Sequence, residues 1–445
     1  MSQHFSNDDN KYVNFAEKIK TVNVSRRHFV KMVGAVAGAA ALAPLLSACG
    51  ANPSTGNSGP APAAGAAGGT AGVVIKKGEP LVAMFSTLDN DYYKMWNAGA
   101  EQAVKALEMK FEVYIDDNKP EVIISNFENK TSQGIRMMFI TTPGAAPVAN
   151  IARTAEESQT YFTNTWNMPD WSTPIDFGDY YVTFFTPNSI QAGYNMAKAL
   201  FEAMGGKGNI LQVSGFPGHT ADWQRTVGLK MALKEYPNIK VLDSQPGNWN
   251  RIDSRRVTEN MLTAYPNVNG IFAQNDDEGI GAMQALEERG IKIPIVGADG
   301  NKETMEFIKA GRFTASVSSF PFWQAGYSAV RTFDAYHGWK PTIPERMMFT
   351  DGLVIDKNNV EQYYNKFYGQ EQIPLDWKLM SRVLYPEDWD PQNLLWPLDP
   401  EEMWGAEVPK PKDYKENEQV KLAKEAGEFD KIKQLYADHY KKKIL

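Results

Sequence analysis

The sequence predicts an α/β protein of two Rossmann-like, doubly wound lobes, joined by a three-strand hinge and followed by an irregular and helical C-terminal extension. Three observations lead to this prediction. Short apolar runs alternate with amphipathic stretches from Leu81 onward, the alternation pauses over 167–180 and restarts, and prolines interrupt the chain after about residue 367. Such alternation is typical of parallel sheets that are covered by helices on both faces.

The first series of elements runs from Leu81 to Thr165. Its amphipathic stretch places Tyr93, Trp96 and Ala100 on one face at helical spacing. Predicted strands are 81–85, 111–115, 137–140 and 161–165, and predicted helices are 90–107, 121–133 and 148–158. The segment 167–180, which contains two prolines, is predicted to be a long loop beside the site.

The second series repeats the same order. Predicted strands are 182–185, 209–213, 239–242, 270–273 and 293–297, and predicted helices are 189–204, 220–235, 254–265, 279–289 and 302–310. Ligands bind beyond the carboxyl ends of strands in such sheets, so polar residues there are candidate ligand contacts. The tail, with its interspersed prolines and tryptophans, is predicted to wrap a lobe and to end in a charged helix near 416–440.

The first 49 residues have the order of a secretory signal. An arginine pair at 26–27 precedes an apolar stretch over 32–46, and a lipobox-like Leu-Ser-Ala-Cys ends at Cys49, the only cysteine of the chain. We expect a twin-arginine lipoprotein signal peptide over 1–48, a lipid on Cys49 and a flexible linker over 49–78. The alternative is a basic loop before a membrane-spanning helix, which needs about 20 apolar residues, and this stretch is shorter.

Charge and composition disfavour several classes of partner and cofactor. After position 48 the chain has 40 basic and 50 acidic residues, which argues against nucleic acid and against adsorption to anionic lipid. Membrane attachment is therefore expected through the lipid alone. The sequence contains no clustered metal ligands, phosphate loop or nucleophile elbow, so we expect neither a cofactor nor a metal.

Polar and aromatic residues lie at the ends of predicted strands in four segments. They are 85–93 (FSTLDNDYY), 220–228 with Arg225, 272–277 (FAQNDD) and 295–300 (IVGADG). Together these segments resemble the ribose-type, or type I, periplasmic sugar-binding proteins of ABC importers, over roughly 81–355. Sugar-sensing repressors share this core, but a helix-turn-helix headpiece would mark a repressor, whereas this N-terminus resembles an export signal.

The resemblance implies a set of ligand-binding residues. The residues that would bond hydroxyl groups are Asn90, Arg225, Asn275 and Asp299. The residues that would pack on a sugar ring are Tyr92, Tyr93 and Trp249. An uncharged sugar needs both kinds, because its ring faces are apolar and its buried hydroxyls require partners. Structural alternatives are helix caps for the asparagines and the aspartate, core packing for the aromatic residues, and an exposed helical position for the arginine.

Two departures separate this chain from ribose binders. Family members commonly carry an Asp-Arg pair after the fourth strand, where this chain has Trp166 within the segment 163–167 (TNTWN), and Ser319 stands where ribose binders carry a glutamine. Trp166 is a candidate for stacking on the ligand, with core packing as the alternative. We therefore expect a pocket that suits something other than ribose.

The chain is expected to cross between the lobes near Thr186, Phe320 and Met347. The predicted N-terminal lobe is 79–186 plus 320–346, and the predicted C-terminal lobe is 187–319 plus 347–366. The predicted extension, packed on a lobe, is 367–445. Hinges of this kind let two lobes close on a ligand.

The predicted function is that of a lipid-anchored solute-binding protein outside the cytoplasmic membrane, in the periplasm or on the cell surface. It would capture a sugar or polyol between its lobes and deliver it to an ABC permease, as a monomer and without catalysis. Two alternatives remain. One is a ligand-presenting sensory binding protein for a chemoreceptor or sensor kinase, and the other is a secreted carbohydrate-active enzyme.

Overall fold

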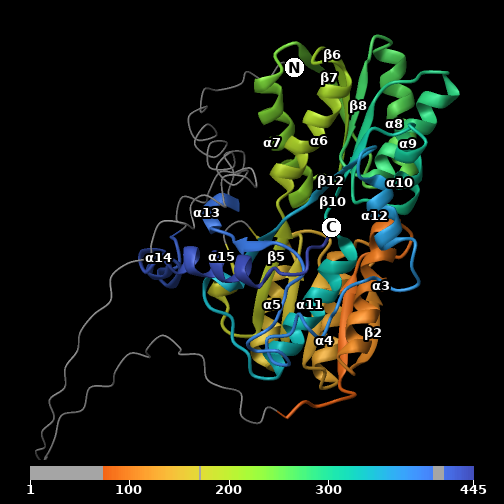
Figure 1. Cartoon of the computed structure of the whole chain (residues 1–445). Coiled ribbons are helices and arrows are strands. Elements are labelled where there is room, and N and C mark those ends of the chain that lie inside the picture. Colours follow the sequence, from red (N-terminus) through yellow and green to blue (C-terminus); the bar gives the residue numbers. More distant parts are fainter. Residues whose placement is uncertain (1–73, 170–171, 404–414) are drawn as a thin grey trace, which may run out of the picture. The chain divides into compact units, whose positions relative to one another are not determined.

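A computed structural model describes residues 74–169, 172–403 and 415–445. The predicted signal peptide, the predicted lipidation site Cys49 and most of the predicted linker lie outside the described residues. The described strands form two separate sheets, each flanked by helices (Figure 1). Among the described helices, none combines the length and the apolar character that crossing a membrane requires.

The first sheet contains seven strands in the order β13-β11-β5-β4-β3-β1-β2. Their bounds are β1 Pro80–Phe85, β2 Lys110–Ile115, β3 Met137–Thr141, β4 Tyr161–Thr165, β5 Tyr181–Pro187, β11 Met347–Thr350 and β13 Leu395–Pro397. All neighbours pair in parallel except β13, which is antiparallel to β11. The helices of this lobe are α3 Asp91–Ala106, α4 Pro120–Ser132, α5 Val148–Ser158 and α11 Pro321–Tyr336, with short 3₁₀ turns η1 Pro174–Asp176 and η2 Pro344–Arg346.

The second sheet contains six strands in the order β12-β10-β9-β8-β6-β7. Their bounds are β6 Gly208–Ser214, β7 Ile239–Pro246, β8 Gly270–Ala273, β9 Ile295–Ala298, β10 Ala315–Ser318 and β12 Leu353–Asp356. The helices are α6 Ser189–Ala203, α7 Thr220–Glu235, α8 Arg251–Ala264, α9 Asp276–Glu288, α10 Lys302–Lys309 and α12 Val360–Phe367. These two sheets confirm the predicted fold class, because each is a mainly parallel sheet flanked by helices.

Burial explains why the apolar runs form strands. All five residues of β3 are buried, as are the last five of β1, so these strands are covered on both faces. Helix α3 buries Trp96, Ala100 and Val104 along one stripe, and each fully buried large side chain contributes about 1.5–3 kcal/mol to folding. The spacing of apolar residues in the sequence therefore indicates which side chains are buried in the core.

Two helices of the second lobe begin earlier than the apolar pattern predicted. Helix α8 starts at Arg251 and α9 at Asp276, because Asn250 and Asn275 are their N-caps. Each asparagine side chain accepts a hydrogen bond from the backbone N–H three residues later. The first turns are polar, so hydrophobic periodicity alone could not locate them.

The chain passes between the two sheets at three places. It leaves β5 at Asn188, leaves β10 at 319–320, and leaves β11 after Thr350. The third crossing is later than the position expected near Met347, because β11 pairs in parallel with β5 and so belongs to the first sheet. The four residues of β11 are apolar or favour strands, and such a short run does not indicate which of the two sheets it joins.

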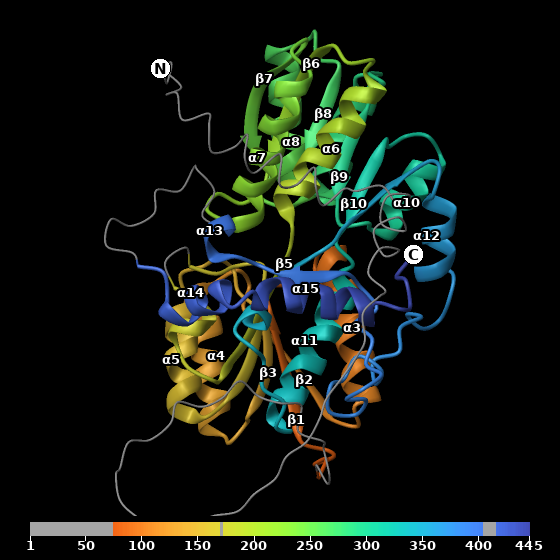
Figure 2. The same ribbon diagram turned by 60° about the vertical axis from the view of Figure 1, so that its left-hand side comes forward.

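The C-terminal extension packs against the first lobe (Figure 2). Strand β13 pairs with β11, and the Leu398 N–H donates to the Met347 carbonyl at 2.8 Å. The buried Asp334 carboxylate on α11 accepts hydrogen bonds from the Ser381 hydroxyl and from the Arg382 N–H, the latter at 2.8 Å. The extension thus covers the edge strand β11, whose backbone groups would otherwise lack partners.

The final segment forms two helices where one was predicted near 416–440. They are α14 Glu418–Glu425 and α15 Glu428–His439, and a short helix, α13 Pro400–Met403, precedes them. Gly427 adopts a left-handed conformation between them, with φ of 67°. Glycine populates this region without steric cost, so the chain can turn there.

The contact between α3 and α11 yields a test of core packing. A Cβ atom on Gly99 would lie 1.9 Å from the Phe322 carbonyl oxygen, so the two helices meet backbone to backbone. Gly99→Ala is expected to lower the free energy of unfolding by about 1–3 kcal/mol, since overpacking outweighs the better helix propensity of alanine. Chemical denaturation measures this loss. Glu101→Ala, on the exposed face of α3, is the control and should change stability by less than about 0.5 kcal/mol.

Candidate functional site

The residues singled out from the sequence lie on segments that follow the carboxyl ends of parallel strands in both sheets. In the first lobe, Tyr92 begins the helix after β1 and Trp166 follows β4. In the second lobe, Arg225 lies on α7 after β6, Trp249 follows β7 and Asp299 follows β9. The structure brings these five side chains together. Direct contacts and mutual electrostatic effects among them link the two lobes.

Arg225 is the residue that joins the two halves of the site. Its guanidinium carbon lies 5.6 Å from the centre of the Trp166 ring and 5.5 Å from that of Trp249. Cation–π attraction at this range strengthens when water is excluded, and Arg225 is only 4% exposed. One terminal nitrogen donates to the Gln274 carbonyl at 2.6 Å, while Nε is buried and has no hydrogen-bond partner among the described residues.

The charge of Arg225 is balanced by buried carboxylates. Burial lowers the pKa of Arg225, and the negative charges of Asp299 and Glu278 act in the opposite direction. Arg225 is buried, so the alternative of an exposed helical position is wrong. A buried guanidinium with a free donor is poised to bind an uncharged acceptor.

Trp166 and Tyr92 form a rigid aromatic pair in the first lobe. The Trp166 indole N–H donates to the Tyr92 hydroxyl, which in turn donates to Gln324 Oε1 at 3.3 Å. Their ring centres lie 5.9 Å apart in an edge-on arrangement. Gln324 also donates to the Ser319 carbonyl at 2.7 Å, so this pair is tied to the second crossing between the lobes. Sequence reasoning missed Gln324, because nothing in helix α11 distinguishes it from a core polar residue.

Trp249 faces Arg225 from the second lobe. Its backbone N–H donates to Glu278 Oε1 at 3.0 Å, and its indole N–H is buried without a partner among the described residues. Only glycine fits at position 215, because a Cβ atom there would lie 2.0 Å from the Trp249 ring. The indole is therefore held in one position with an unused donor.

Asp299 presents a carboxylate that no described residue engages. Its side chain is 4% exposed and forms no hydrogen bond within the described ranges. Burial raises the pKa of Asp299 well above its usual value, and Arg225 opposes this rise. The backbone at Asp299 has φ of 124°, a conformation that L-residues rarely adopt. Such strain is maintained only where the surroundings impose it.

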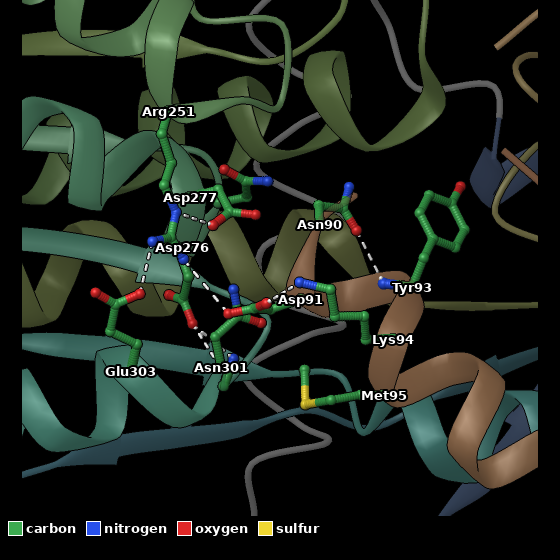
Figure 3. Close-up of polar contacts among 12 residues, drawn as sticks. Asn90, Asp91, Tyr93, Lys94, Met95, Arg251, Asp276, Asp277, Asn301 and Glu303 are labelled. Atoms are coloured by element: carbon green, nitrogen blue, oxygen red, sulfur yellow. Dashed lines mark hydrogen bonds and ion pairs between the residues drawn. The ribbon is translucent and has the colours of Figure 1, made fainter. Parts of the chain in front are cut away.

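Asp276 fixes the turn that follows Asp299 through hydrogen bonds, among them one from Asn301 (Figure 3). Its Oδ2 accepts from the N–H groups of Gly300 and Asn301 at 2.9 and 2.8 Å, and its Oδ1 accepts from the Ser316 hydroxyl at 2.7 Å. These bonds fix the turn between β9 and α10. Burial raises the pKa of Asp276 to about 7, and the hydrogen bonds to its carboxylate act against that rise.

Asn90 and Asn275 both cap helices, so the structural alternative foreseen for them is realised. Asn90 Oδ1 accepts from the Tyr93 N–H at 2.9 Å, and Asn275 Oδ1 accepts from the Glu278 N–H at 2.8 Å. In both residues the side-chain nitrogen forms no hydrogen bond with a described residue. Capping thus fixes the amide while leaving its two donor hydrogens unused, and a cap does not rule out contact with a ligand.

Tyr93 stacks on Phe85, with ring centres 5.5 Å apart, and meets the Tyr92 ring edge-on at 5.1 Å. It is accompanied by three polar groups at the ends of β1, β2 and β3, which are Ser86, Asp116 and Thr141. Burial raises the pKa of Tyr93 to about 12 and that of Asp116 to about 6. These three residues were missed, although the same strand-end rule that found Asn275 also selects them.

A charged cluster links the lobes at a second point. Arg251, the first residue of α8, donates to Asp277 and Glu303 at 2.6 Å each and lies 3.4 Å from Asp91 at the start of α3 (Figure 3). Sequence reasoning missed this cluster, because its members are separated by up to 212 positions in residue number. Partial exposure of Arg251 and Asp91 limits the contribution of that ion pair to about 1 kcal/mol or less.

Asn167 and His219 form a third link between the lobes. Asn167 Nδ2 lies 3.1 Å from His219 Nε2, and the Thr220 N–H donates to Asn167 Oδ1 at 3.2 Å. The His219 ring lies beside both tryptophans, at 6.3 Å from Trp166 and 5.7 Å from Trp249. Sequence reasoning treated this histidine as one of several scattered ones, since only the fold brings it beside the other residues.

Within 74–169, 172–403 and 415–445, no set of three or more His, Cys, Asp or Glu side chains is arranged to hold a metal ion.

The fold and this group of residues together define a two-lobed binding protein, in which side chains from two α/β lobes meet at the ends of their strands. A model of the periplasmic binding protein domain matches residues 81–338. The chain therefore belongs to the periplasmic binding protein family, and the resemblance inferred from the sequence is confirmed.

Individual relatives agree with this assignment. The ribose import binding protein of Haemophilus influenzae is 28% identical over 239 residues, which cover 53% of this chain and 78% of that protein. A crystal structure of a twin-arginine translocation pathway signal protein from Burkholderia phytofirmans is 26% identical, with a TM-score of 0.63, covering 67% of this chain and 95% of that one. A periplasmic solute-binding protein of an ABC transporter from Actinobacillus succinogenes, with bound D-allose, is 26% identical with a TM-score of 0.60 and covers 64% and 100%.

The capping role of Asn275 can be separated from any role in binding. Asn275→Ala removes the acceptor for the Glu278 N–H and is expected to lower the free energy of unfolding by about 1 kcal/mol. Asn275→Ser keeps an acceptor at the cap and should lose at most a few tenths of a kcal/mol. Urea denaturation of the ligand-free protein measures both values. Equal losses in the two variants would show that the cap contributes nothing.

Proposed function

We propose that this chain captures an uncharged sugar or polyol between its two lobes and passes it to an ABC permease. The observation that carries the proposal is the set of unused polar groups around Arg225 and Asp299. Donors without a partner among the described residues are Arg225 Nε, the Trp249 indole N–H and the side-chain nitrogens of Asn90 and Asn275, and the Asp299 carboxylate is an acceptor without one. A molecule with several hydroxyl groups satisfies both kinds, because each hydroxyl donates and accepts.

The electrostatics support an uncharged ligand. Arg225 is a buried cation and Asp299 a buried carboxyl, and each shifts the pKa of the other toward the charged form. A charged ligand would leave one buried charge without compensation, which costs several kcal/mol. The indole of Trp249 and the pair of Trp166 and Tyr92 supply the flat apolar surfaces that suit the faces of a sugar ring.

The family relationship supports transport and location. Two of the relatives described above are named as a ribose import binding protein and as a periplasmic solute-binding protein of an ABC transporter with D-allose bound. By analogy, we infer that this chain works outside the cytoplasmic membrane, carries out no chemistry, and signals to the permease by closing its lobes on the ligand. Absence of turnover of the bound sugar is part of the same proposal.

Export by the twin-arginine route and lipid anchoring at Cys49 are part of the proposal. The order of the arginine pair, the apolar stretch and the lipobox supports both. The solved relative from Burkholderia phytofirmans is itself described as a twin-arginine translocation pathway signal protein. We infer that the lipid attaches the chain to a membrane, that no nucleic acid is bound and that the protein is a monomer.

Loss of the Asp299 carboxylate tests the binding site. Asp299→Asn is expected to weaken the affinity for the preferred sugar by roughly 10- to 150-fold, which corresponds to hydrogen bonds from hydroxyls to a charged acceptor. Thermal shift of the whole chain against monosaccharides and polyols identifies the ligand, and titration calorimetry measures the dissociation constant. A ligand at about 100 times its dissociation constant should stabilise the wild type by about 2.7 kcal/mol.

The control for this experiment is Asp388→Asn, whose carboxylate is exposed in the C-terminal extension and should leave the affinity unchanged. Equal affinity of wild type and Asp299→Asn would contradict the placement of the ligand. Conversion of the sugar during incubation would favour an enzyme instead.

Anchoring is tested by Cys49→Ser in the native host. Without the thiol no lipid can be attached, so the protein is expected to move from the membrane fraction to the soluble fraction. Fractionation followed by immunodetection measures this change. Arg26→Lys combined with Arg27→Lys should instead keep the precursor uncleaved inside the cell, and retention of the Cys49→Ser protein in the membrane fraction would refute lipid anchoring at this residue.

A further inference from the structure

The amide of Asn167, on the first lobe, caps a helix of the second lobe. Asn167 follows β4, and His219 and Thr220 stand at the start of α7. Asn167 Oδ1 accepts from the Thr220 N–H at 3.2 Å, and this N–H is one of the first-turn donors that have no partner within their own helix. The side chain of Asn167 is fully buried. This cap therefore exists only while the two lobes are in contact.

The orientation of the Asn167 amide is fixed by the first lobe. Its Nδ2 donates to the Thr142 carbonyl at 2.7 Å, and the backbone carbonyl of Asn167 accepts from Asn164 Nδ2 at 2.6 Å. Rotating the amide would oppose two carbonyl oxygens at Thr142 and two N–H groups at Thr220. The side-chain nitrogen, with its hydrogens, consequently faces His219 Nε2.

His219 faces a hydrogen-bond donor at each ring nitrogen. Its Nδ1 lies 3.2 Å from the Ala221 nitrogen and its Nε2 lies 3.1 Å from Asn167 Nδ2. In the neutral tautomer that carries its proton on Nδ1, Nε2 is the acceptor for Asn167. A neutral imidazole offers one acceptor nitrogen, so it satisfies one of these two donors, whereas an imidazolium satisfies neither. Among the described residues, the charged group beside the ring is Arg225, on the same helix, and the aromatic neighbours from other elements are the indoles of Trp166 and Trp249, which do not titrate.

We propose that Asn167, His219 and Thr220 form a clasp that holds the lobes closed when His219 is neutral and releases them when it is protonated. Asn167 and His219 are positioning residues in this proposal, because they act through closure rather than by contact with ligand. The inference rests on the proposed function only where it concerns ligand affinity. Closure of the ligand-free protein is an independent consequence.

The direction of the pH effect follows from the two states of His219. In the closed arrangement burial, and then Arg225, lower the pKa of His219 to about 3, whereas a histidine in water has a pKa of about 6.5. The closed state therefore binds fewer protons, so closure is fully favoured above about pH 6.5 and weakens as the pH falls toward 3. Between pH 7.5 and pH 5.5 the ratio of closed to open molecules should fall about tenfold.

The test measures the distance between the lobes without ligand. Spin labels at Lys119→Cys and Arg256→Cys, both exposed and on different lobes, in the full chain with Cys49→Ser, report closure by pulsed electron resonance. The closed fraction should fall from pH 7.5 to pH 5.5. His219→Asn keeps a good helix cap but does not titrate, and should abolish this pH dependence. Asn167→Ala should reduce the closed fraction at both pH values.

The matched control is His337→Asn. His337 is also buried, but its partners, Phe333 and Lys76, both belong to the first lobe, so this variant should retain the wild-type pH dependence. Asn167→Asp places a carboxylate before His219 and should reverse the effect, with more closed protein at pH 5.5 than at pH 7.5.

The second readout is the dissociation constant of the sugar that gives the largest thermal shift. It should rise about tenfold from pH 7.5 to pH 5.5 in the wild type and in His337→Asn, and less than twofold in His219→Asn. The clasp is refuted if the ligand-free closed fraction of the wild type is the same at both pH values, or if His219→Asn keeps the wild-type dependence. If no sugar binds, the proposed function fails while the distance measurement still decides the clasp.

Discussion

The buried guanidinium of Arg225, held between two indoles from different lobes, is the interaction on which the site depends. Its attraction to Trp166 and Trp249 brings the strand ends of two sheets to a common point. The cost of burying this cation is offset by Asp299 and Glu278, which are themselves buried. These groups compensate part of each other's charge without hydrogen-bonding to one another, so the site retains donors and acceptors that have no partner among the described residues.

That arrangement has consequences for motion. The polar contacts that join the lobes involve the Arg251 cluster and the clasp as well as Arg225. The rings of Phe322 on α11 and Phe367 on α12, 4.7 Å apart, add an apolar contact between the lobes. When the lobes open, the polar contacts can be exchanged for contacts with water, unlike the packed apolar one. The C-terminal extension packs on the first lobe and pairs with β11, next to the third crossing, which makes this lobe the more rigid support of the hinge.

Much of the fold could be predicted because its signals are local. Leu81–Phe85 forms β1 since an unbroken apolar run must be covered on both faces, and the strand-end rule selected Asn275 and Asp299 before any contact was known. The early start of α8 and α9, the late third crossing after Thr350 and the split of the last helix at Gly427 were missed. Each of these depends on a cap, a pairing partner or a turn conformation, which hydrophobic periodicity does not report.

The sequence by itself determined the two-lobed class, the strand ends at which polar residues gather, and a family resemblance that the comparisons confirmed. The tertiary structure alone decided which of those residues meet, since Asn167 and His219 or Asp91 and Arg251 are distant in the chain. It also decided what each side chain is free to do: Asn275 caps a helix with its oxygen, whereas Asp299 bonds to no described residue. Hydrogen-bond satisfaction is a property of three-dimensional neighbours, so no pattern along the chain could reveal it.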